Sequence, residues 1–172
     1  MYQQYGDVRI LEQHYASMVA YMDYLERRAV RYVQPFGGFG DWLAIEPTNS
    51  MLTNTAYSAY DALIMEQVAK RLGKDADQRR FRTFYENVKR SFNDLFVNEE
   101  GRTFAPTVES IFGKDSQVGM WPGTAATEAK IVDTQTSYVV PLQFDLFNEK
   151  NKPLAIRHLV ENIKKHNYTL TT

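Results

Sequence analysis

The chain is predicted to be all-α and to be built from antiparallel helical hairpins. Apolar residues recur at alternating steps of three and four over several long segments, which is the spacing of a helix face. Segments with one apolar face alternate with segments that are apolar on nearly every side. The strict alternation of apolar and polar residues that is typical of sheets is missing.

Three of the predicted helices have a single apolar face. They cover residues 11–29, 75–97 and 153–165. Charged and polar residues occupy the remaining faces, so one side of each helix is expected to contact the core and the other to contact solvent. Pro153 suits the first turn of its helix, because a proline in that turn loses no intrahelical hydrogen bond.

Two further helices are predicted to be apolar over most of their circumference. They cover residues 53–72, followed by Gly73 as a stop signal, and residues 134–147, where Pro141 is expected to introduce a kink. Helices of this composition are usually covered by protein on most sides. The order along the chain is therefore outer, inner, outer, inner, outer, as two layers of antiparallel hairpins require.

Two long irregular segments, residues 33–52 and 106–132, interrupt this pattern. Each leads from an outer helix to an inner helix, whereas the short turns lead from inner to outer helices. In an up-and-down arrangement, both long loops then lie at one end, beside the N-termini of the inner helices. Loops of this length usually bind or catalyse, and helix N-termini offer amide donors, so a ligand site is expected at this end.

Composition restricts the classes of partner. The chain has 172 residues, 44% of them hydrophobic, and a formal net charge of -1, which is typical of a soluble globular domain. Lysine plus arginine number 20 and aspartate plus glutamate number 21, without a basic block, so neither a nucleic acid nor a membrane surface is an expected partner. The sequence shows no signal-peptide pattern and no cysteine, and the cellular compartment stays open.

No metal or cofactor is expected. His14, His158 and His166 are not grouped with carboxylates at the spacing of a metal site. The glycine-rich residues 36–40 lack the preceding strand and the following lysine of a phosphate-binding loop. These glycines are expected to serve tight turns instead.

Several motifs resemble the catalytic domain of bacterial alpha-L-rhamnosidases. They are Gly40-Asp41-Trp42-Leu43, the run of residues 52–74, and Thr134-Gln135-Thr136-Ser137-Tyr138, and Tyr5-Gly6-Asp7 and Leu170-Thr171-Thr172 extend the similarity over essentially the whole chain. The resemblance implies an (α/α)6 barrel of six helical hairpins and inverting hydrolysis of terminal alpha-L-rhamnosides. It also implies a rhamnose-containing glycan or glycoside as substrate, bound where the inner helices begin.

The resemblance further implies that the chain is an incomplete catalytic domain. The general acid of the family lies before the matched region and the general base lies after it, so no catalytic residue is expected within residues 1–172. The chain is interpreted as a single piece that supplies about five of the twelve barrel helices. Because inverting hydrolysis needs two carboxyl groups, this piece alone is expected to be inactive. Its inner helices are expected to expose apolar faces and to promote self-association.

Asp41 and Trp42 are the substrate-binding residues that the resemblance implies. The carboxylate would accept hydrogen bonds from sugar hydroxyl groups, and the indole would pack on the apolar edge of a deoxy sugar. The alternative is structural, with Asp41 capping the turn before the helix at residues 53–72 and Trp42 filling space between hairpins. For Gln135 the resemblance suggests a family position, and the alternative is a side chain that only hydrogen-bonds loop backbone. Trp121 either forms a variable wall of the pocket or serves as a hydrophobic latch.

Two other functional hypotheses stay open. In the first, the chain is a complete helical-repeat module that presents its two long loops to a glycan or peptide, although no repeated residues are evident. In the second, it is a small hydrolase in which Asp41 forms a carboxylate pair with Asp133 or Glu128.

Overall fold

The five predicted helices are all present in the computed structural model, which describes residues 2–35, 40–41, 43–113 and 130–171. They are α2 (Arg9–Arg28), α3 (Ser50–Arg71), α4 (Asp75–Phe96), α6 (Gln135–Gln143) and α7 (Asn151–Lys165). Two short helices, α1 (Tyr2–Tyr5) and α5 (Val108–Phe112), and two short strands, β1 (Phe104–Ala105) and β2 (Lys130–Ile131), complete the described elements. The predicted helical fold class is confirmed.

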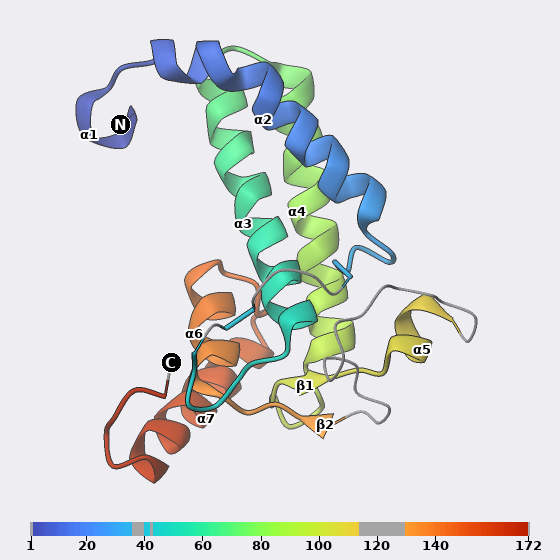
Figure 1. Ribbon diagram of the computed structural model, residues 1–172, viewed down its shortest axis with the longest axis vertical. Coiled ribbons are helices and arrows are strands. Elements are labelled where there is room, and N and C mark those ends of the chain that lie inside the picture. The colour runs from blue at the N-terminus through green and yellow to red at the C-terminus, as the bar shows by residue number, and fades with distance from the viewer. Residues whose placement is uncertain (1, 36–39, 42, 114–129, 172) are drawn as a thin grey trace.

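Helices α3 and α4 form a long antiparallel hairpin, drawn in green in Figure 1. Helix α3 ends just before Gly73, the predicted stop, and the amide of Lys74 donates to the carbonyl of Ala69 at 2.8 Å. Fully buried side chains of the hairpin include Ala59, Ala62, Phe81, Val88 and Phe92. The small alanines of α3 leave room for the large phenylalanines of α4, so the hairpin can pack without voids.

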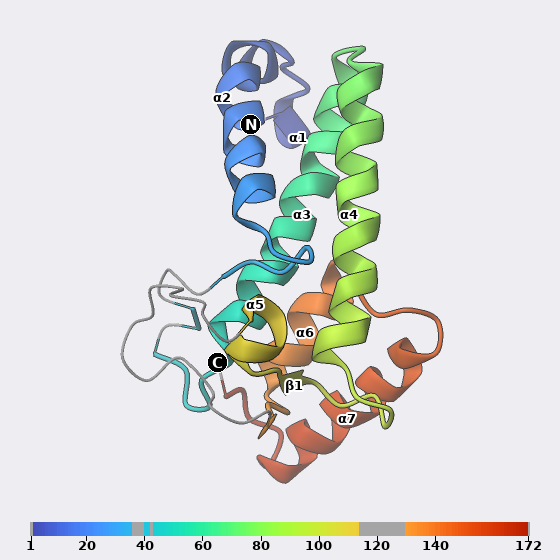
Figure 2. The same ribbon diagram turned by 90° about the vertical axis from the view of Figure 1, so that its right-hand side faces the viewer.

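Helix α2 lies against the hairpin as an outer helix (Figures 1 and 2). It buries Met22 and Leu25 and leaves its polar residues toward solvent, as its single apolar face predicts. Arg80 of α4 pairs with Glu26 of α2 at 2.9 Å and also with Asp23. These ion pairs are partly exposed, so they fix the orientation of the two helices more than they stabilise the fold.

Helix α6 begins as predicted but ends early. It was expected to reach residue 147, whereas it ends at Gln143, two residues after Pro141. The backbone then adopts a positive φ of 53° at Asp145 and turns toward α7. Leu146 and Phe147 are buried all the same, so their apolar character reflects a buried connection. The prediction of helix at residues 144–147 is therefore wrong, because burial without helix produces a similar local composition.

The small sheet was not predicted. Strands β1 and β2 pair antiparallel, with Phe104 opposite Ile131 and Ala105 opposite Lys130. Each strand has only two residues, which is too short for a period-two pattern to be recognised. Strand β2 leads into the N-terminus of α6 (Figure 1), so the sheet helps to position that helix.

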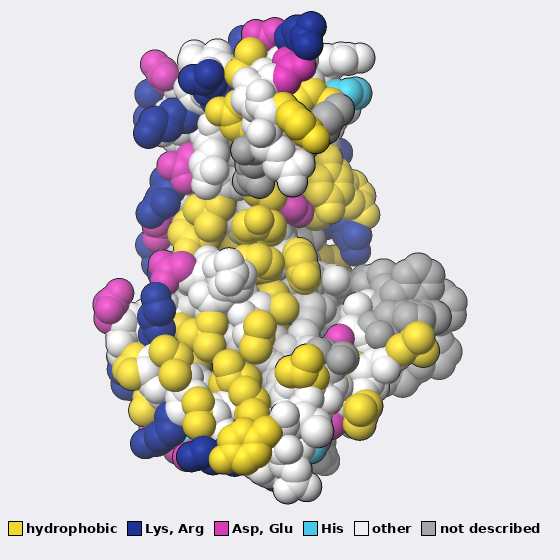
Figure 3. Space-filling model, turned by 90° about the vertical axis from the view of Figure 1, so that its left-hand side faces the viewer, with side chains coloured by type: hydrophobic (Ala, Val, Ile, Leu, Met, Phe, Trp, Pro, Cys, Tyr) yellow, Lys and Arg dark blue, Asp and Glu magenta, His cyan; other side chains and the backbone are white. Residues whose placement is uncertain are grey.

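Helices α3 and α6 expose part of their apolar surface, as expected for the inner helices of this chain. Tyr57, Tyr60 and Ile64 are 51%, 38% and 39% exposed, and Val139 on α6 is 48% exposed. These four residues define what we term the apolar face. Figure 3 shows hydrophobic side chains gathered over α3 and α6 on one side of the molecule.

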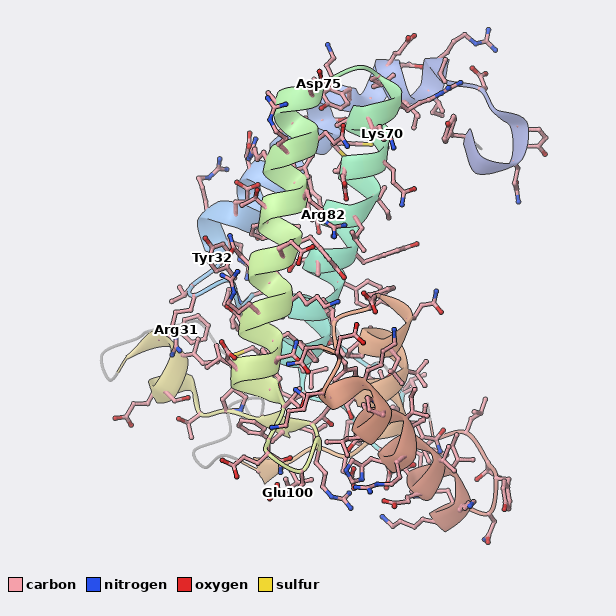
Figure 4. All side chains as sticks on the ribbon, turned by 180° about the vertical axis from the view of Figure 1, so that it is seen from behind. Arg31, Tyr32, Lys70, Asp75, Arg82 and Glu100 are labelled. Carbon is pink, nitrogen blue, oxygen red and sulfur yellow. The ribbon has the colours of Figure 1, made fainter. Side chains whose placement is uncertain are left out.

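The side of α4 that carries Arg82 has a different character. Arg82, labelled in Figure 4, pairs with Glu86 at 2.5 Å and with Glu66 at 3.5 Å. Charged pairs of this kind are typical of a solvated helix surface, so α4 presents the polar outer side that its pattern predicts.

Across the residues that the structure describes, none of the helices combines the length and apolar composition needed to cross a membrane.

Candidate functional site

The loop before α3 presents Asp41 through a tight turn. Gly40 has a positive φ of 57°, and a Cβ atom added there would lie 3.3 Å from the Cβ of Ser50. Any larger residue would be strained in this backbone conformation and close to α3. The amide of Ala44 donates to the carbonyl of Asp41 at 3.4 Å and closes the turn. The glycine therefore holds Asp41 beside the N-terminus of α3.

The carboxylate of Asp41 does not cap α3. The cap is Asn49, whose Oδ1 accepts hydrogen bonds from the amides of Met51 at 3.1 Å and Leu52 at 3.2 Å. Asp41 instead accepts a hydrogen bond at its Oδ2 from the hydroxyl of Thr48 at 3.1 Å. Within the described residues its Oδ1 has no hydrogen-bond partner.

The N-terminus of α6 lies against the same loop. The hydroxyl groups of Thr48 and Thr134 are 2.6 Å apart, although the two residues are 86 positions apart in sequence. Thr134 caps α6, and its Oγ1 accepts from the amide of Ser137 at 3.2 Å. This contact places the loop of residues 33–52 against the N-cap of α6, so α3 and α6 begin at the same end of the molecule.

Asp133 has a structural role. Its Oδ2 accepts a hydrogen bond from Arg102 at 2.6 Å, and its Oδ1 accepts one from the hydroxyl of Tyr138. Burial raises the pKa of Tyr138, and the hydrogen bond to Asp133 adds to this effect. Both oxygens of Asp133 are therefore occupied, which disfavours the hypothesis that Asp133 and Asp41 form a catalytic carboxylate pair.

The side-chain amide of Gln135 hydrogen-bonds loop backbone near the C-terminus. Its Nε2 donates to the carbonyl of Thr169 at 2.9 Å, and its Oε1 accepts from the amide of Thr171 at 3.3 Å. Gln135 is buried, and both polar groups of its amide face the backbone. The structural interpretation of Gln135 is the one that this geometry supports.

A contact between Glu46 and His166, near α6, could not be recognised from the sequence. Glu46 Oε1 lies 3.1 Å from Nε2 of His166, and the amide of Glu46 donates to the carbonyl of Thr171 at 3.3 Å. Glu46 Oε2 and the hydroxyl of Thr171 are buried without a partner in the described part of the chain. A glutamate and a histidine separated by most of the sequence carry no local signal, so only the fold reveals this pair.

Several candidates lie outside the described residues. Trp42, Trp121 and Glu128 belong to this group, so their predicted roles stay untested.

His158 contacts Glu161 at 3.2 Å and the carbonyl of Glu100 at 2.8 Å. The part of the chain that the structure describes contains no group of three or more histidine, aspartate or glutamate side chains arranged to hold a metal ion.

Comparisons with known proteins agree on one family. The profile of the bacterial alpha-L-rhamnosidase 6 hairpin glycosidase domain matches residues 1–172. The alpha-L-rhamnosidase of Formosa agariphila is 28% identical over 100% of this chain and 17% of its own length. That of Streptomyces avermitilis is 26% identical over 100% of this chain and 14% of its own length. The chain thus spans only a small part of these relatives.

Solved structures show the same arrangement of helices. The crystal structure of the Streptomyces avermitilis alpha-L-rhamnosidase complexed with L-rhamnose has a TM-score of 0.78 and 26% identity, covering 100% of this chain and 14% of that chain. The alpha-L-rhamnosidase from Dictyoglumus thermophilum has a TM-score of 0.74 and 29% identity, covering 98% of this chain and 17% of that chain. With a family match over its whole length, the chain belongs to the bacterial alpha-L-rhamnosidase six-hairpin glycosidase domain family.

Proposed function

We propose that this chain is a segment of a larger inverting alpha-L-rhamnosidase and supplies part of its sugar-binding surface. The support is the match to alpha-L-rhamnosidases over the full length of the chain, one of them described in complex with L-rhamnose. The substrate class is then a glycan or glycoside that carries a terminal alpha-L-rhamnosyl group. No observation in the fold favours the alternative of an independent helical-repeat module.

The observation that carries this proposal is the environment of Asp41. Its carboxylate lies at the end of the molecule where α3 and α6 begin, and Thr48 holds one of its two oxygens. The other oxygen accepts a hydroxyl hydrogen bond from the sugar, and the positive ends of the two helices favour polar ligands. Trp42, next in sequence, packs on the apolar edge of the deoxy sugar in this proposal.

Catalysis requires groups from outside this chain. Inverting hydrolysis uses a general acid and a general base about 6.5–9.5 Å apart, with a water molecule between the base and the anomeric carbon. We assign Asp41 to binding, because one of its oxygens is held by Thr48 and the nearby Asp133 is paired with Arg102. The general acid and base then come from other segments of the parent enzyme, and residues 1–172 alone do not turn over substrate.

The apolar face supports the same proposal. Tyr57, Tyr60 and Ile64 lie on an inner helix and are exposed, although exposing large apolar side chains to water does not stabilise a monomer. In a six-hairpin barrel the inner helices pack against one another, so further hairpins would cover this surface. The chain covers 14% to 17% of the length of the relatives, which leaves ample sequence in the parent for such hairpins.

Hydrolysis of a chromogenic alpha-L-rhamnoside tests the proposal. The 172-residue chain and a longer form of the protein that includes its flanking coding sequence are assayed side by side. We expect turnover only by the longer form. Asp41→Asn in that form is expected to lower kcat/KM roughly ten- to a hundredfold, the usual effect of losing a hydrogen bond to a charged group.

Asp94→Asn is the matched control, because Asp94 is an exposed aspartate on α4. It is expected to leave kcat/KM unchanged. Turnover by the 172-residue chain would show that the catalytic carboxylates lie within it and would overturn the assignment of Asp41 to binding alone. Inactivity of the longer form on rhamnosides, with activity on another sugar, would overturn the proposed substrate.

A further inference from the structure

A chain of hydroxyl groups connects the N-terminus of α6 to Asp41. The amide of Ser137 lies 3.2 Å from Oγ1 of Thr134, which lies 2.6 Å from Oγ1 of Thr48, which lies 3.1 Å from Oδ2 of Asp41. Thr48 is 7% exposed and Thr134 is 5% exposed, so solvent does not compete for these hydroxyl groups. The connection links the beginnings of the two inner helices.

The number of available protons sets the direction of the hydrogen bonds in this series. An ionised carboxylate only accepts, so the single hydroxyl proton of Thr48 is donated to Asp41. The proton between Thr48 and Thr134 must then come from Thr134, whose own oxygen accepts the amide proton of Ser137. Every bond in the series points toward Asp41, and bonds aligned in this way polarise one another.

The neighbouring hydroxyl of Ser137 is consistent with this direction. It accepts from the amide of Thr134 at 3.1 Å, donates to the carbonyl of Thr134 at 2.7 Å, and lies 2.7 Å from Oγ1 of Thr103. Since its one proton goes to the carbonyl, Thr103 is the donor in the last of these contacts. No hydroxyl in the cluster has to donate twice, so the assignment satisfies all of its members.

We propose that Thr48 is a positioning residue, which holds Oδ2 of Asp41 so that Oδ1 faces the sugar hydroxyl. The inference rests on the proposed function and deepens it, because it names the residue that orients the binding carboxylate. Without the hydroxyl of Thr48, the Asp41 side chain gains rotational freedom, and part of the binding free energy is lost in ordering it again. The capped start of α6 acts through Thr48 and does not contact the ligand.

The test uses two variants, Thr48→Val, which keeps the shape but removes the hydroxyl, and Thr48→Ser, which keeps the hydroxyl. Sugar binding is measured in the longer form of the protein and the Asp41 resonance in the 172-residue chain. The dissociation constant of L-rhamnose is measured by ligand titration in NMR. The carboxyl carbon resonance of Asp41 is recorded without sugar as an independent readout. Thr53→Val is the matched control, because Thr53 is also buried and its hydroxyl donates to the carbonyl of Ser50 within the same helix, at 3.1 Å.

Thr48→Val is expected to weaken L-rhamnose binding about tenfold and to move the Asp41 carboxyl resonance, while Thr48→Ser and Thr53→Val stay within about twofold of the unaltered chain. Equal binding and equal resonances in all variants would overturn the positioning role. Equal loss in the valine and serine variants would also overturn it, since packing alone would then explain the effect.

The two proposals fail separately. If the unaltered longer form does not bind L-rhamnose, the sugar-binding proposal for this segment fails. The carboxyl resonance of Asp41 still decides the positioning role: a shift in Thr48→Val that Thr48→Ser restores supports it, and no shift overturns it.

Discussion

At the scale of single residues, Asp61 shows what partial burial does to an ionisable group on an inner helix. It lies on α3 in a shallow hollow that is also lined by Met18, Tyr21, Ile64 and Met65. Burial raises the pKa of Asp61 above its ordinary value. Its carboxylate makes no hydrogen bond or ion pair within the described residues, so nothing offsets the cost of removing the charge from water.

Asp61→Asn is expected to stabilise the chain at neutral pH. Because the folded-state pKa is raised, Asp61 contributes stability below its unfolded-state pKa and loses that contribution as pH rises through the folded-state value. The variant should therefore be more stable at pH 7, by less than about 1 kcal/mol because solvent screens part of the effect, and no more stable below about pH 3. Urea unfolding at both pH values measures this, with the exposed Asp94→Asn as control. A variant that is less stable at pH 7 would contradict the prediction.

At the scale of elements, the connection between α4 and β1 depends on a close approach to α7. Gly101 has a positive φ of 76°, and a Cβ atom there would lie 2.4 Å from the Cβ of Leu154 on α7. Gly73, between α3 and α4, has a similar φ of 66° but open space around it. The two glycines therefore separate the cost of backbone strain from the cost of steric overlap.

Gly101→Ala is expected to destabilise the chain more than Gly73→Ala. Both substitutions strain the left-handed backbone by about 1–2 kcal/mol. Gly101→Ala adds overlap with Leu154, which costs about 1–3 kcal/mol more. Free energies of unfolding from urea titration provide the comparison. Equal losses in the two variants would mean that α7 moves away at little cost.

At the scale of the whole molecule, this segment has one charged side and one side with exposed apolar residues. The α4 surface around Arg82 carries paired charges, whereas α3 and α6 expose the apolar face. Exposed apolar area of this kind usually marks an interface. In the proposed parent enzyme the remaining hairpins cover it, and in the separate chain only a second copy or solvent can do so.

The separate chain is expected to self-associate through the apolar face. Light scattering at micromolar concentrations should give a mass above that of the 19.9 kDa monomer, and Ile64→Lys should lower it by placing a charge in the contact. Thr83→Lys, at an exposed position on α4, should leave the mass unchanged. A monomer that binds no hydrophobic dye would count against self-association. It would also count against the interpretation that other hairpins of the barrel cover this surface.

Much of the architecture was predictable because helix formation is governed by local spacing. The periods of three and four, the stop at Gly73 and the alternation of one-sided and all-apolar segments identified the five main helices. The sequence motif around Gly40 and Asp41 also indicated the loop on which the candidate site lies. Residues 144–147 were assigned to a helix in error, because burial in a connection and burial in a helix select the same apolar side chains.

The sequence by itself determined the fold class, the order of inner and outer helices, and the family to which the chain belongs. Only the tertiary structure decided the polar contacts: that Asn49 caps α3, that Asp133 pairs with Arg102, and that Thr48 joins Asp41 to Thr134. The physical reason is the range of the interactions. A helix depends on neighbours three and four residues away, whereas a side-chain hydrogen bond depends on atoms that only packing brings together.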